Sequence, residues 1–226
     1  MKSLPAQCLP DPLPSNPLII AEQWLTEARS DADVPNPNAM VLASVDSAGQ
    51  PSARVVLCKS ILPESGAITF FTNFQSRKGQ ELAANPCAAA VFHWDHRHRQ
   101  VRIEGSVQPL ESSESEAYFQ TRHWFSRLGA WASQQSAPLP RGQTLAQLVT
   151  EAARRLGLPY GGPGTPEPAT IDVDIPKPPY WGGYSLRAHA VELWVEGAFR
   201  LHDRARWTRD VAGPKPGAWS GLRLQP

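Results

Sequence analysis

Short apolar and β-branched runs, separated by turn residues, dominate the first half of the chain. Turn signals such as DSAGQ and PESG lie between them, and runs of this length with such boundaries are typical of antiparallel β-strands. The pattern predicts a three-stranded meander and then a second hairpin, with further strands at VELWV, RARWTR and WSGLRLQ. The runs of the meander and the hairpin are AMVLASV (39–45), SARVVLCK (52–59), AITFFTN (67–73), CAAAVFHW (87–94) and QVRIEGSVQPL (100–110).

Helices are expected at the edges of these strands. Asn16 followed by a proline is a favourable N-cap and first helical residue, which predicts a helix over 17–29. Ser76 can cap a short helix, RKGQELAAN, that stops before Pro86. Because helices do not alternate with strands as in βαβ units, the pattern favours a mainly β, antiparallel barrel with peripheral helices.

Two capping-box patterns predict helices in the second half of the chain. In such a box, a Ser or Thr side chain accepts from the backbone N–H of the residue three positions later. The Glu or Gln side chain at that position accepts from the backbone N–H of the Ser or Thr. Ser113 with Glu116 predicts a helix that runs to about Arg122. Thr144 with Gln147 predicts a helix that ends at a glycine, the residue at position 157.

Clusters of proline set the expected domain limits. Residues 1–17 hold five prolines and residues 159–179 hold seven. Since proline lacks a backbone donor and restricts the residue before it, neither stretch is expected to form much regular structure. We therefore expect a flexible N-terminal arm over 1–16, a single domain over 17–226, and an extended connection over 159–179.

Composition and charge exclude several function classes. The chain has 22 Lys+Arg against 21 Asp+Glu, a net charge of +1, so no global field attracts it to nucleic acid or to a membrane surface. Mean hydropathy is -0.36, and no apolar run reaches the ~18 residues of a membrane span. The start of the sequence lacks a signal-peptide core. None of Cys8, Cys58 and Cys87 forms a CxxC pair, so we expect reduced thiols and a cytoplasmic location.

Cations gather at the expected start of the short helix. The strand end at Thr72 leads through a polar turn to Ser76, Arg77 and Lys78. Cations in the first turn oppose the helix dipole, so stability alone does not favour them. Exposed backbone N–H groups, a hydroxyl and two cations suit a phosphate. A solvated helix start is the alternative interpretation.

Two further pairs could bind an anion. Tyr118 and Arg122 are four residues apart, so on one helix they would share a face and could clamp a small anionic ring compound. The alternative is that this pair covers the edge of the core. Arg54 and Lys59 would face opposite sides of an ideal strand, and a twist or bulge would be needed to bring both to one site.

The segment RLHDR (200–204) carries three cationic or titratable groups. On a strand, alternation would send Arg200, His202 and Arg204 to one face and Leu201 and Asp203 to the other. Such groups repel one another unless an anion lies before them, which indicates an anion site. A solvated edge strand, where salt screens the repulsion, is the alternative.

Other familiar site patterns are missing from the sequence. HWDHRHR (93–99) holds three histidines, but Arg97 and Arg99 would repel a metal ion, so we expect a polar hairpin loop and no metal site. There is no GxSxG motif and no cysteine has a neighbouring histidine. The glycine-rich stretch YGGPGTP is interrupted by proline and opens no helix, which excludes a Walker A loop and a Rossmann turn.

Taken together, these segments resemble the pyridoxamine 5′-phosphate oxidase family of FMN-dependent enzymes. The resemblance spans about residues 36–226, with the motifs in family order. It implies an FMN-binding split β-barrel that works as a homodimer with FMN at the interface, and it makes 180–226 a dimerisation and substrate segment. The motifs are ARVVLCK (53–59), FFTNFQSRKGQEL (70–82), RQVRIEGSV (99–107), YFQTRHWFSRLGAWASQQS (118–136), WGGY (181–184), VELW (191–194) and RLHDR (200–204).

The resemblance also implies site residues. The FMN ligands would be Arg54, Val55, Val56, Leu57, Cys58, Lys59, Phe71, Thr72, Arg77, Lys78, Gln100, Gln135, Ser136, Trp194 and Arg204. The substrate would contact Lys59, Tyr118, Arg122, Ser126, Arg200 and His202. The first four of these would bind its phosphate. Arg200 and His202, the implied catalytic residues, would lie over its ring beside the reacting carbon.

The implied reaction belongs to vitamin B6 biosynthesis. Pyridoxamine or pyridoxine 5′-phosphate would lose a hydride from C4′ to FMN and become pyridoxal 5′-phosphate, and O₂ would reoxidise the flavin to give H₂O₂. One alternative is a phenazine-biosynthesis-type flavin oxidase of the same superfamily. Another is a non-catalytic protein that binds FMN or pyridoxal phosphate. Tyr118, Arg122 and Ser126 favour a phosphorylated substrate, and Arg200 with His202 favours an enzyme.

Overall fold

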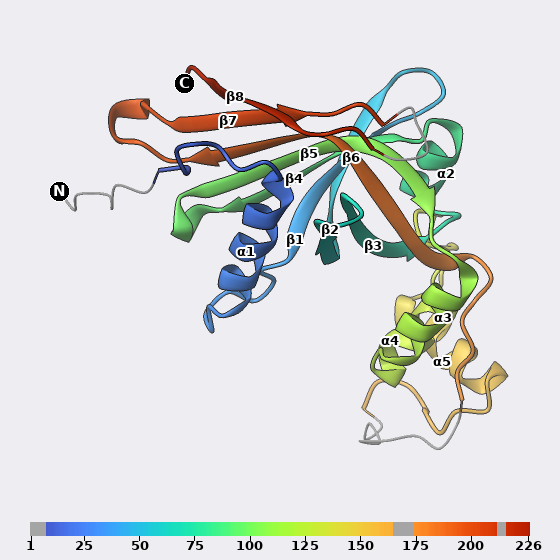
Figure 1. Cartoon of the computed structure of the whole chain (residues 1–226). Coiled ribbons are helices and arrows are strands. Elements are labelled where there is room, and N and C mark those ends of the chain that lie inside the picture. The colour runs from blue at the N-terminus through green and yellow to red at the C-terminus, as the bar shows by residue number, and fades with distance from the viewer. Residues whose placement is uncertain (1–7, 165–173, 212–215) are drawn as a thin grey trace. The chain divides into compact units, whose positions relative to one another are not determined.

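The computed structural model describes residues 8–164, 174–211 and 216–226 of the chain (Figure 1). The chain forms two compact units, each with a core of its own. Unit 1 comprises Met1–Phe70, Ala84–Gln108 and Tyr184–Pro226, and unit 2 comprises Phe71–Ala83 and Pro109–Gly183. In the part of the chain that the structure describes, no helix is both long and apolar enough to span a membrane.

The strands form one sheet that closes into a barrel. Neighbouring strands follow the order β3-β2-β1-β4-β5-β6-β7-β8, and a further pairing between β3 and β6 closes six of them into an antiparallel barrel. β7 and β8 continue the sheet beyond β6, as Figure 1 shows. The mainly β antiparallel barrel expected from the sequence is confirmed. The strands are β1 (Ala39–Val45), β2 (Pro51–Leu62), β3 (Ala67–Asn73), β4 (Cys87–Trp94), β5 (Arg99–Pro109), β6 (Trp181–Val195), β7 (Asp203–Thr208) and β8 (Ser220–Leu224).

Helices in the described part of the chain follow the sequence signals closely in most cases. Asn16 caps the first of them by accepting a hydrogen bond from the Leu18 N–H at 3.1 Å. Thr144 and Gln147 form the expected reciprocal capping box. Gly157, just beyond the end of α5, has a φ of 67°, which favours glycine. The helices are α1 (Pro17–Arg29), α2 (Arg77–Ala84), α3 (Ser112–Gln120), α4 (Trp124–Ala132) and α5 (Leu145–Arg155).

The expected capping box at Ser113 is wrong. α3 begins two residues earlier than a Ser113 cap would place it, at Ser112, and its N-cap residue Glu111 makes no side-chain cap. The start of α3 is tied instead to Gly183: the Leu110 N–H donates to its carbonyl at 2.9 Å, and the Gly183 N–H donates to Ser115 Oγ at 3.0 Å. Contacts distant in sequence therefore override the local capping signal.

Each unit has its own apolar core. In unit 1, α1 packs against β2 through a face that includes Leu18, Trp24 and Leu25, and the guanidinium of Arg99 lies 4.9 Å from the Trp24 ring. In unit 2, the clustered helices α3, α4 and α5 in Figure 1 enclose a second core. Its buried members include Phe119, Trp124, Leu128, Ala152, Ala153, Ile175 and Trp181.

The segment before α1 is bound to the C-terminal strands of unit 1. Residues 8–16 form no helix or strand, as their prolines predict. The Leu9 N–H donates to Asp203 Oδ2 at 2.7 Å, and the Trp207 indole N–H donates to the Pro14 carbonyl at 2.9 Å. Residues 1–7 of the expected arm and 165–173 of the expected connection lie outside the described residues.

Candidate functional site

Three aromatic rings stack in unit 2, contributed by β3, α3 and the start of β6. The ring centroids of Phe71 and Tyr118 are 4.1 Å apart, and those of Phe71 and Trp181 are 5.3 Å apart. A Cβ at Gly183 would lie 2.7 Å from the Phe71 ring, so a glycine is required for the ring to fit. Phe71, Tyr118 and Trp181 thus form a stack of nearly parallel rings, here called the aromatic wall.

Arg122 lies against the aromatic wall. Its guanidinium carbon is 4.9 Å from the Trp181 ring centre, a cation–π distance. Its buried Nη1 has no hydrogen-bond partner in the described part of the chain. Burial lowers the pKa of Arg122, an effect that Tyr118 opposes. A desolvated cationic donor beside flat rings suits an anionic group.

The expected shared helix face of Tyr118 and Arg122 is wrong. α3 ends at Gln120, so Arg122 lies in the turn after the helix, where its N–H donates to the Phe119 carbonyl at 3.2 Å. The two residues nevertheless meet at Trp181, whose ring contacts both. Ser126, which was expected in the same cluster, is an exposed residue of α4.

A lysine is buried at the start of α2. Lys78 Nζ donates to Gln135 Oε1 at 2.8 Å and to the hydroxyls of Thr72 and Ser76 at 3.2 Å. The Thr72 hydroxyl also donates to Gln135 Oε1 at 3.2 Å. Ser76 caps α2 as predicted, because its Oγ accepts from the Gly79 N–H at 3.3 Å. The structure thus brings Thr72, Lys78 and Gln135 together.

A pocket of about 400 Å³ opens beside this cluster in unit 2. Arg77 lines this pocket. Its side chain is exposed, and its Nε donates to Glu81 Oε1 at 2.8 Å. Ser136 adopts a left-handed φ of 74°, a conformation that costs energy in a non-glycine residue. The lining residues are Gln75, Arg77, Gln80, Gln134, Gln135, Ser136 and Ala137. They offer amide and cationic donors suited to a phosphate.

The run Arg54–Lys59 lies on β2 in unit 1. Arg54 is held by the hydroxyls of Ser44 and Ser52, and Val55 and Leu57 are exposed. The pairing of β2 with β3 shifts between Cys58 and Ser60, so Lys59 is the extra residue of a β-bulge. A twist or a bulge was expected to be needed to bring Arg54 and Lys59 to one site, and a bulge is present at Lys59.

Cys58 is fully buried in the barrel. Its thiol donates to the Ser60 carbonyl at 3.3 Å, and its N–H donates to the Asn38 carbonyl at 2.9 Å. Burial raises the pKa of the Cys58 thiol to about 12. The side chain therefore stays a neutral thiol at physiological pH and packs in the core.

Arg200 lies in a strained turn between β6 and β7. Phe199 and Arg200 have φ values of 54° and 67°, and β7 begins only at Asp203. The expectation that strand alternation places Arg200, His202 and Arg204 on one face is therefore wrong. Two successive left-handed residues of this kind cost roughly 1–2 kcal/mol each, and such strain is concentrated at functional sites. Phe199 is also 87% exposed.

His202 closes this turn against β6. Its ring centroid lies 4.6 Å from that of Trp194, and its Nδ1 accepts from the Gly197 N–H at 3.2 Å. When neutral, His202 therefore carries its proton on Nε2. A Cβ at Gly197 would lie 1.7 Å from the Leu201 carbonyl oxygen, so a side chain there would displace the turn.

Arg204 belongs to an ion-pair network across β5, β6 and β7. It donates from Nε and Nη2 to Glu192 Oε1 at 3.1 and 2.8 Å, and Arg102 donates to the other oxygen of Glu192 at 3.3 Å. On the same strands, hydrogen bonds from Arg206 lower the pKa of Glu104. Gln100, another expected ligand, is a half-buried residue of β5 that pairs with His93 of β4.

The histidine-rich segment 93–99 forms a hairpin connection, as expected. His96 bonds to Asp31 Oδ2 at 2.8 Å, and Arg97 pairs with the same carboxylate. The described residues contain no group of three or more His, Cys, Asp or Glu side chains placed to hold a metal ion.

Comparison with known proteins connects these observations to a family. A model described as pyridoxamine 5′-phosphate oxidase matches residues 26–155, and one described as pyridoxine 5′-phosphate oxidase C-terminal dimerisation region matches residues 181–226. The chain belongs to the pyridoxamine 5′-phosphate oxidase family. It is an enzyme, and its cofactor is FMN.

Individual relatives agree with this assignment. The pyridoxine/pyridoxamine 5′-phosphate oxidase of Cupriavidus taiwanensis is 44% identical over 93% of this chain and 89% of its own. The enzyme of the same name from Hyphomonas neptunium is 43% identical over 95% of this chain and 89% of its own.

Solved structures show the same fold. PhzG from Burkholderia lata, in complex with tetrahydrophenazine-1-carboxylic acid, has a TM-score of 0.79 and 32% identity, covering 96% of this chain and 95% of that chain. A pyridoxamine 5′-phosphate oxidase-related, FMN-binding protein from Nostoc punctiforme has a TM-score of 0.66 and 18% identity, covering 92% and 96% of the two chains.

The residues present in unit 2 fit the phosphate of FMN. The buried Lys78 amine bonds to Thr72, Ser76 and Gln135, and the adjoining pocket is lined by Arg77 and by side-chain amides. Donors of this kind, beside the first turn of a helix, are those that a phosphate dianion requires.

Three residues that position the site were not assigned from the sequence. Trp181 completes the aromatic wall, Gly197 shapes the turn of Arg200, and Glu192 holds Arg204. Trp181 lies in the WGGY motif, which was the signal available for it. Glu192 lies in the VELW motif, but its contact with Arg204 depends on the pairing of β6 with β7.

Proposed function

We propose that this enzyme oxidises pyridoxamine 5′-phosphate or pyridoxine 5′-phosphate to pyridoxal 5′-phosphate, with O₂ as electron acceptor and H₂O₂ as product. The supporting observation is Arg122, whose buried Nη1 lacks a hydrogen-bond partner among the described residues and whose guanidinium lies on the Trp181 ring. An aromatic wall beside an unsatisfied cation suits a flat substrate that carries a phosphate. The names of the curated relatives support the same substrate class.

FMN binding is proposed for the residues assigned by the resemblance. Arg77 and Lys78, with Thr72, Gln135 and Ser136, would hold the phosphate. When bound, FMN accepts the hydride that leaves the substrate carbon and passes the electrons to oxygen. The remaining proposed ligands are Arg54, Val55, Val56, Leu57, Cys58, Lys59, Phe71, Gln100, Trp194 and Arg204.

The substrate is proposed to be held at its two ends. Tyr118 and Arg122, with Lys59 and Ser126, would bind the phosphate. The turn that carries Arg200 and His202 would orient the ring. The amine substrate loses a hydride and a proton to give an imine, which water hydrolyses to the aldehyde and ammonia. The alcohol substrate loses a hydride and a proton to give the aldehyde directly.

A second candidate is oxidation of a reduced tricyclic acid. It rests on the likeness to PhzG, which was solved with tetrahydrophenazine-1-carboxylic acid. That ligand carries a carboxylate and no phosphate. The two candidates therefore differ in what Arg122 would bind, and a phosphate-dependent measurement separates them.

Arg122→Gln is expected to raise the KM for pyridoxamine 5′-phosphate roughly 10- to 100-fold, because a charge-assisted hydrogen bond to a phosphate contributes about 1.5–3 kcal/mol. The rate of pyridoxal phosphate formation measures this change. The ratio of the KM for unphosphorylated pyridoxamine to the KM for pyridoxamine 5′-phosphate should fall by the same factor. FMN affinity should stay unchanged.

The matched control is Arg154→Gln, which removes an exposed arginine of α5 that pairs with Glu151. It should leave the KM unchanged. An unchanged KM in Arg122→Gln would contradict the proposed phosphate contact. Turnover of a reduced phenazine carboxylic acid, without turnover of pyridoxamine 5′-phosphate, would favour the second candidate.

A homodimer is also proposed, with part of its interface on β1 and β2. Val41 and Val55 are paired across these strands and are 42% and 65% exposed, and Leu57 is exposed beside them. Apolar side chains gathered on one face indicate a surface covered by a partner. The matching C-terminal dimerisation region supports self-association.

Sedimentation equilibrium of the FMN-saturated protein is expected to give about twice the chain mass of 24.8 kDa. Val55→Lys would place a charge in the proposed interface and should raise the dimer dissociation constant at least tenfold. Leu145 of α5 is 66% exposed and provides the matched control. Leu145→Lys should leave the dimer intact, and an equal effect of the two substitutions would contradict this interface.

A further inference from the structure

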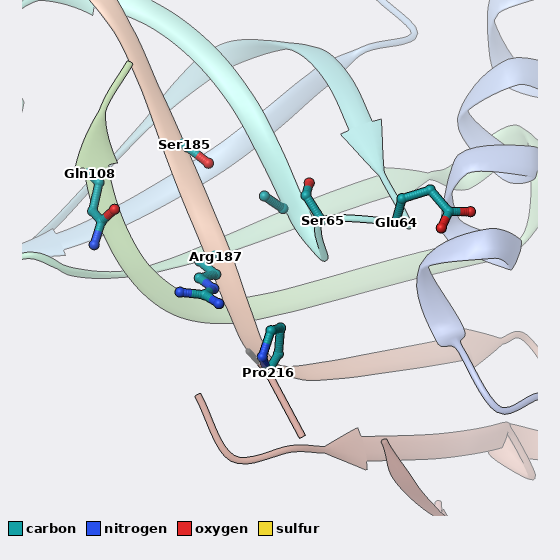
Figure 2. A pocket seen from close by; sticks show the side chains of 7 residues that line it. Glu64, Ser65, Gln108, Ser185, Arg187 and Pro216 are labelled. Carbon is teal, nitrogen blue, oxygen red and sulfur yellow. The ribbon is translucent and has the colours of Figure 1, made fainter. Parts of the chain in front are cut away.

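A second pocket, of about 290 Å³, lies in unit 1 and is built from residues that neither FMN nor the substrate is proposed to contact. Its walls come from the β2–β3 turn, the end of β5, the start of β6 and the segment before β8 (Figure 2). The lining residues are Glu64, Ser65, Ala67, Gln108, Ser185, Arg187 and Pro216.

The pocket has a positive character. Arg187 makes no side-chain hydrogen bond or ion pair within the ranges that the structure describes. Arg209 lies beside the pocket, because its guanidinium bonds to Gly66, which stands between the lining residues Ser65 and Ala67. Burial, and then the charge of Arg187, lower the pKa of Arg209. Arg209 donates to the carbonyls of Ala188 at 2.8 Å and Gly66 at 2.9 Å, which are neutral acceptors. Arg187 in the pocket wall and Arg209 beside the pocket therefore give this part of unit 1 two positive charges.

The acidic residue of the pocket does not offset these charges. Figure 2 shows the Glu64 carboxylate directed away from Arg187. The amide of Gln108 lies on the same side as the Arg187 guanidinium, and the Ser185 hydroxyl also lines the pocket. The Ser65 hydroxyl donates to the Leu62 carbonyl at 3.4 Å. The groups that line this side can all donate hydrogen bonds, and Arg187 can donate two in parallel.

The backbone around Arg187 is fixed by close packing. A Cβ at Gly105 of β5 would lie 2.0 Å from the Arg187 carbonyl oxygen, so the two strands approach closely at this point. Gly66 has a φ of 70°, and a Cβ there would lie 1.9 Å from the Arg209 guanidinium. The guanidinium of Arg209 also lies 4.3 Å from the centre of the Trp219 ring. These contacts fix the backbone at Arg187 and the guanidinium of Arg209.

We propose that this pocket binds a small phosphate-bearing anion at a site separate from the FMN and substrate sites. The ligand's phosphate would accept two hydrogen bonds from Arg187 and further ones from Gln108 and the Ser185 hydroxyl. The charge of the phosphate would also relieve the repulsion between Arg187 and Arg209. The proposal does not depend on which substrate the enzyme oxidises.

Trp219 provides a local reporter, because it is stacked on Arg209. We would label the FMN-loaded protein with 5-fluorotryptophan, assign the Trp219 signal by Trp219→Phe, and titrate inorganic phosphate at constant ionic strength by ¹⁹F NMR. The Trp219 signal should shift saturably. Arg187→Gln should weaken the apparent affinity at least tenfold, and Gln108→Glu, which adds a negative charge without shortening the side chain, should do the same.

The matched control is Arg122→Gln, which alters the proposed substrate site in unit 2 and should leave the Trp219 titration unchanged. Equal phosphate titrations of the wild type and Arg187→Gln would overturn the proposed site. So would an Arg122→Gln variant in which the Trp219 response disappears. Acetate that shifts the signal with the affinity of phosphate would overturn the assignment to a phosphate ligand.

Discussion

Replacing Lys78 with methionine is expected to raise the dissociation constant for FMN roughly 10- to 100-fold. The Lys78 amine is buried beside the hydroxyls of Thr72 and Ser76 and the side chain of Gln135. A charge-assisted hydrogen bond to the FMN phosphate would contribute about 1.5–3 kcal/mol, which corresponds to that factor. Methionine keeps a similar length and removes the charge. Quenching of flavin fluorescence on titration into the apoprotein measures the affinity.

Lys177→Met is the matched control, since it removes a lysine of the same unit. The Lys177 amine donates to the Trp181 carbonyl at 3.3 Å. It should leave the FMN affinity within about twofold of the wild type. Lys78→Arg should restore part of the lost affinity, because the charge returns with different geometry. Wild-type FMN affinity in a folded Lys78→Met protein would contradict the proposed phosphate site.

Arg200→Ala is expected to lower kcat roughly 100-fold while changing FMN affinity little. Arg200 lies in an exposed turn with a left-handed φ of 67°, and removing a charged donor from a reacting centre typically costs about 10²- to 10³-fold in rate. Single-turnover reduction of the flavin, followed with saturating substrate, measures the step that Arg200 is proposed to assist.

Leu201→Ala separates the charge from the shape of the turn. Leu201 is the next residue and is 71% exposed, and it is not among the proposed site residues. The substitution should reduce kcat by less than about threefold. An Arg200→Ala variant with wild-type turnover would contradict the role of Arg200. Equal losses in both variants would show that the turn, rather than the guanidinium, matters.

Local sequence signals predicted the strands that lie between clear turns. β1, β3 and β4 begin and end where their apolar runs do. β6 begins at Trp181, well before the expected strand VELWV. Its first part was not predicted, because Gly182 and Gly183 are weak strand formers. Those glycines are needed for packing, since a Cβ at either would come within 2.7 Å of a phenylalanine ring.

The errors arise where contacts distant in sequence determine the structure. α4 was not expected, because WFSRLGAWA contains a glycine and bulky aromatic residues, yet burial of Trp124 and Leu128 stabilises it. The turn at Arg200 was taken for a strand because alternation cannot detect a left-handed conformation. The cation-rich start of α2 was visible in the local sequence, whereas the contact of Lys78 with Gln135 depends on the fold.

Anaerobic mixing of the FMN-loaded enzyme with pyridoxamine 5′-phosphate tests the central claim most directly. The visible flavin band is expected to bleach as the substrate is oxidised, and to return when air is admitted, with pyridoxal 5′-phosphate and H₂O₂ formed. A flavin band that stays unchanged with pyridoxamine and pyridoxine 5′-phosphates would contradict the proposed reaction.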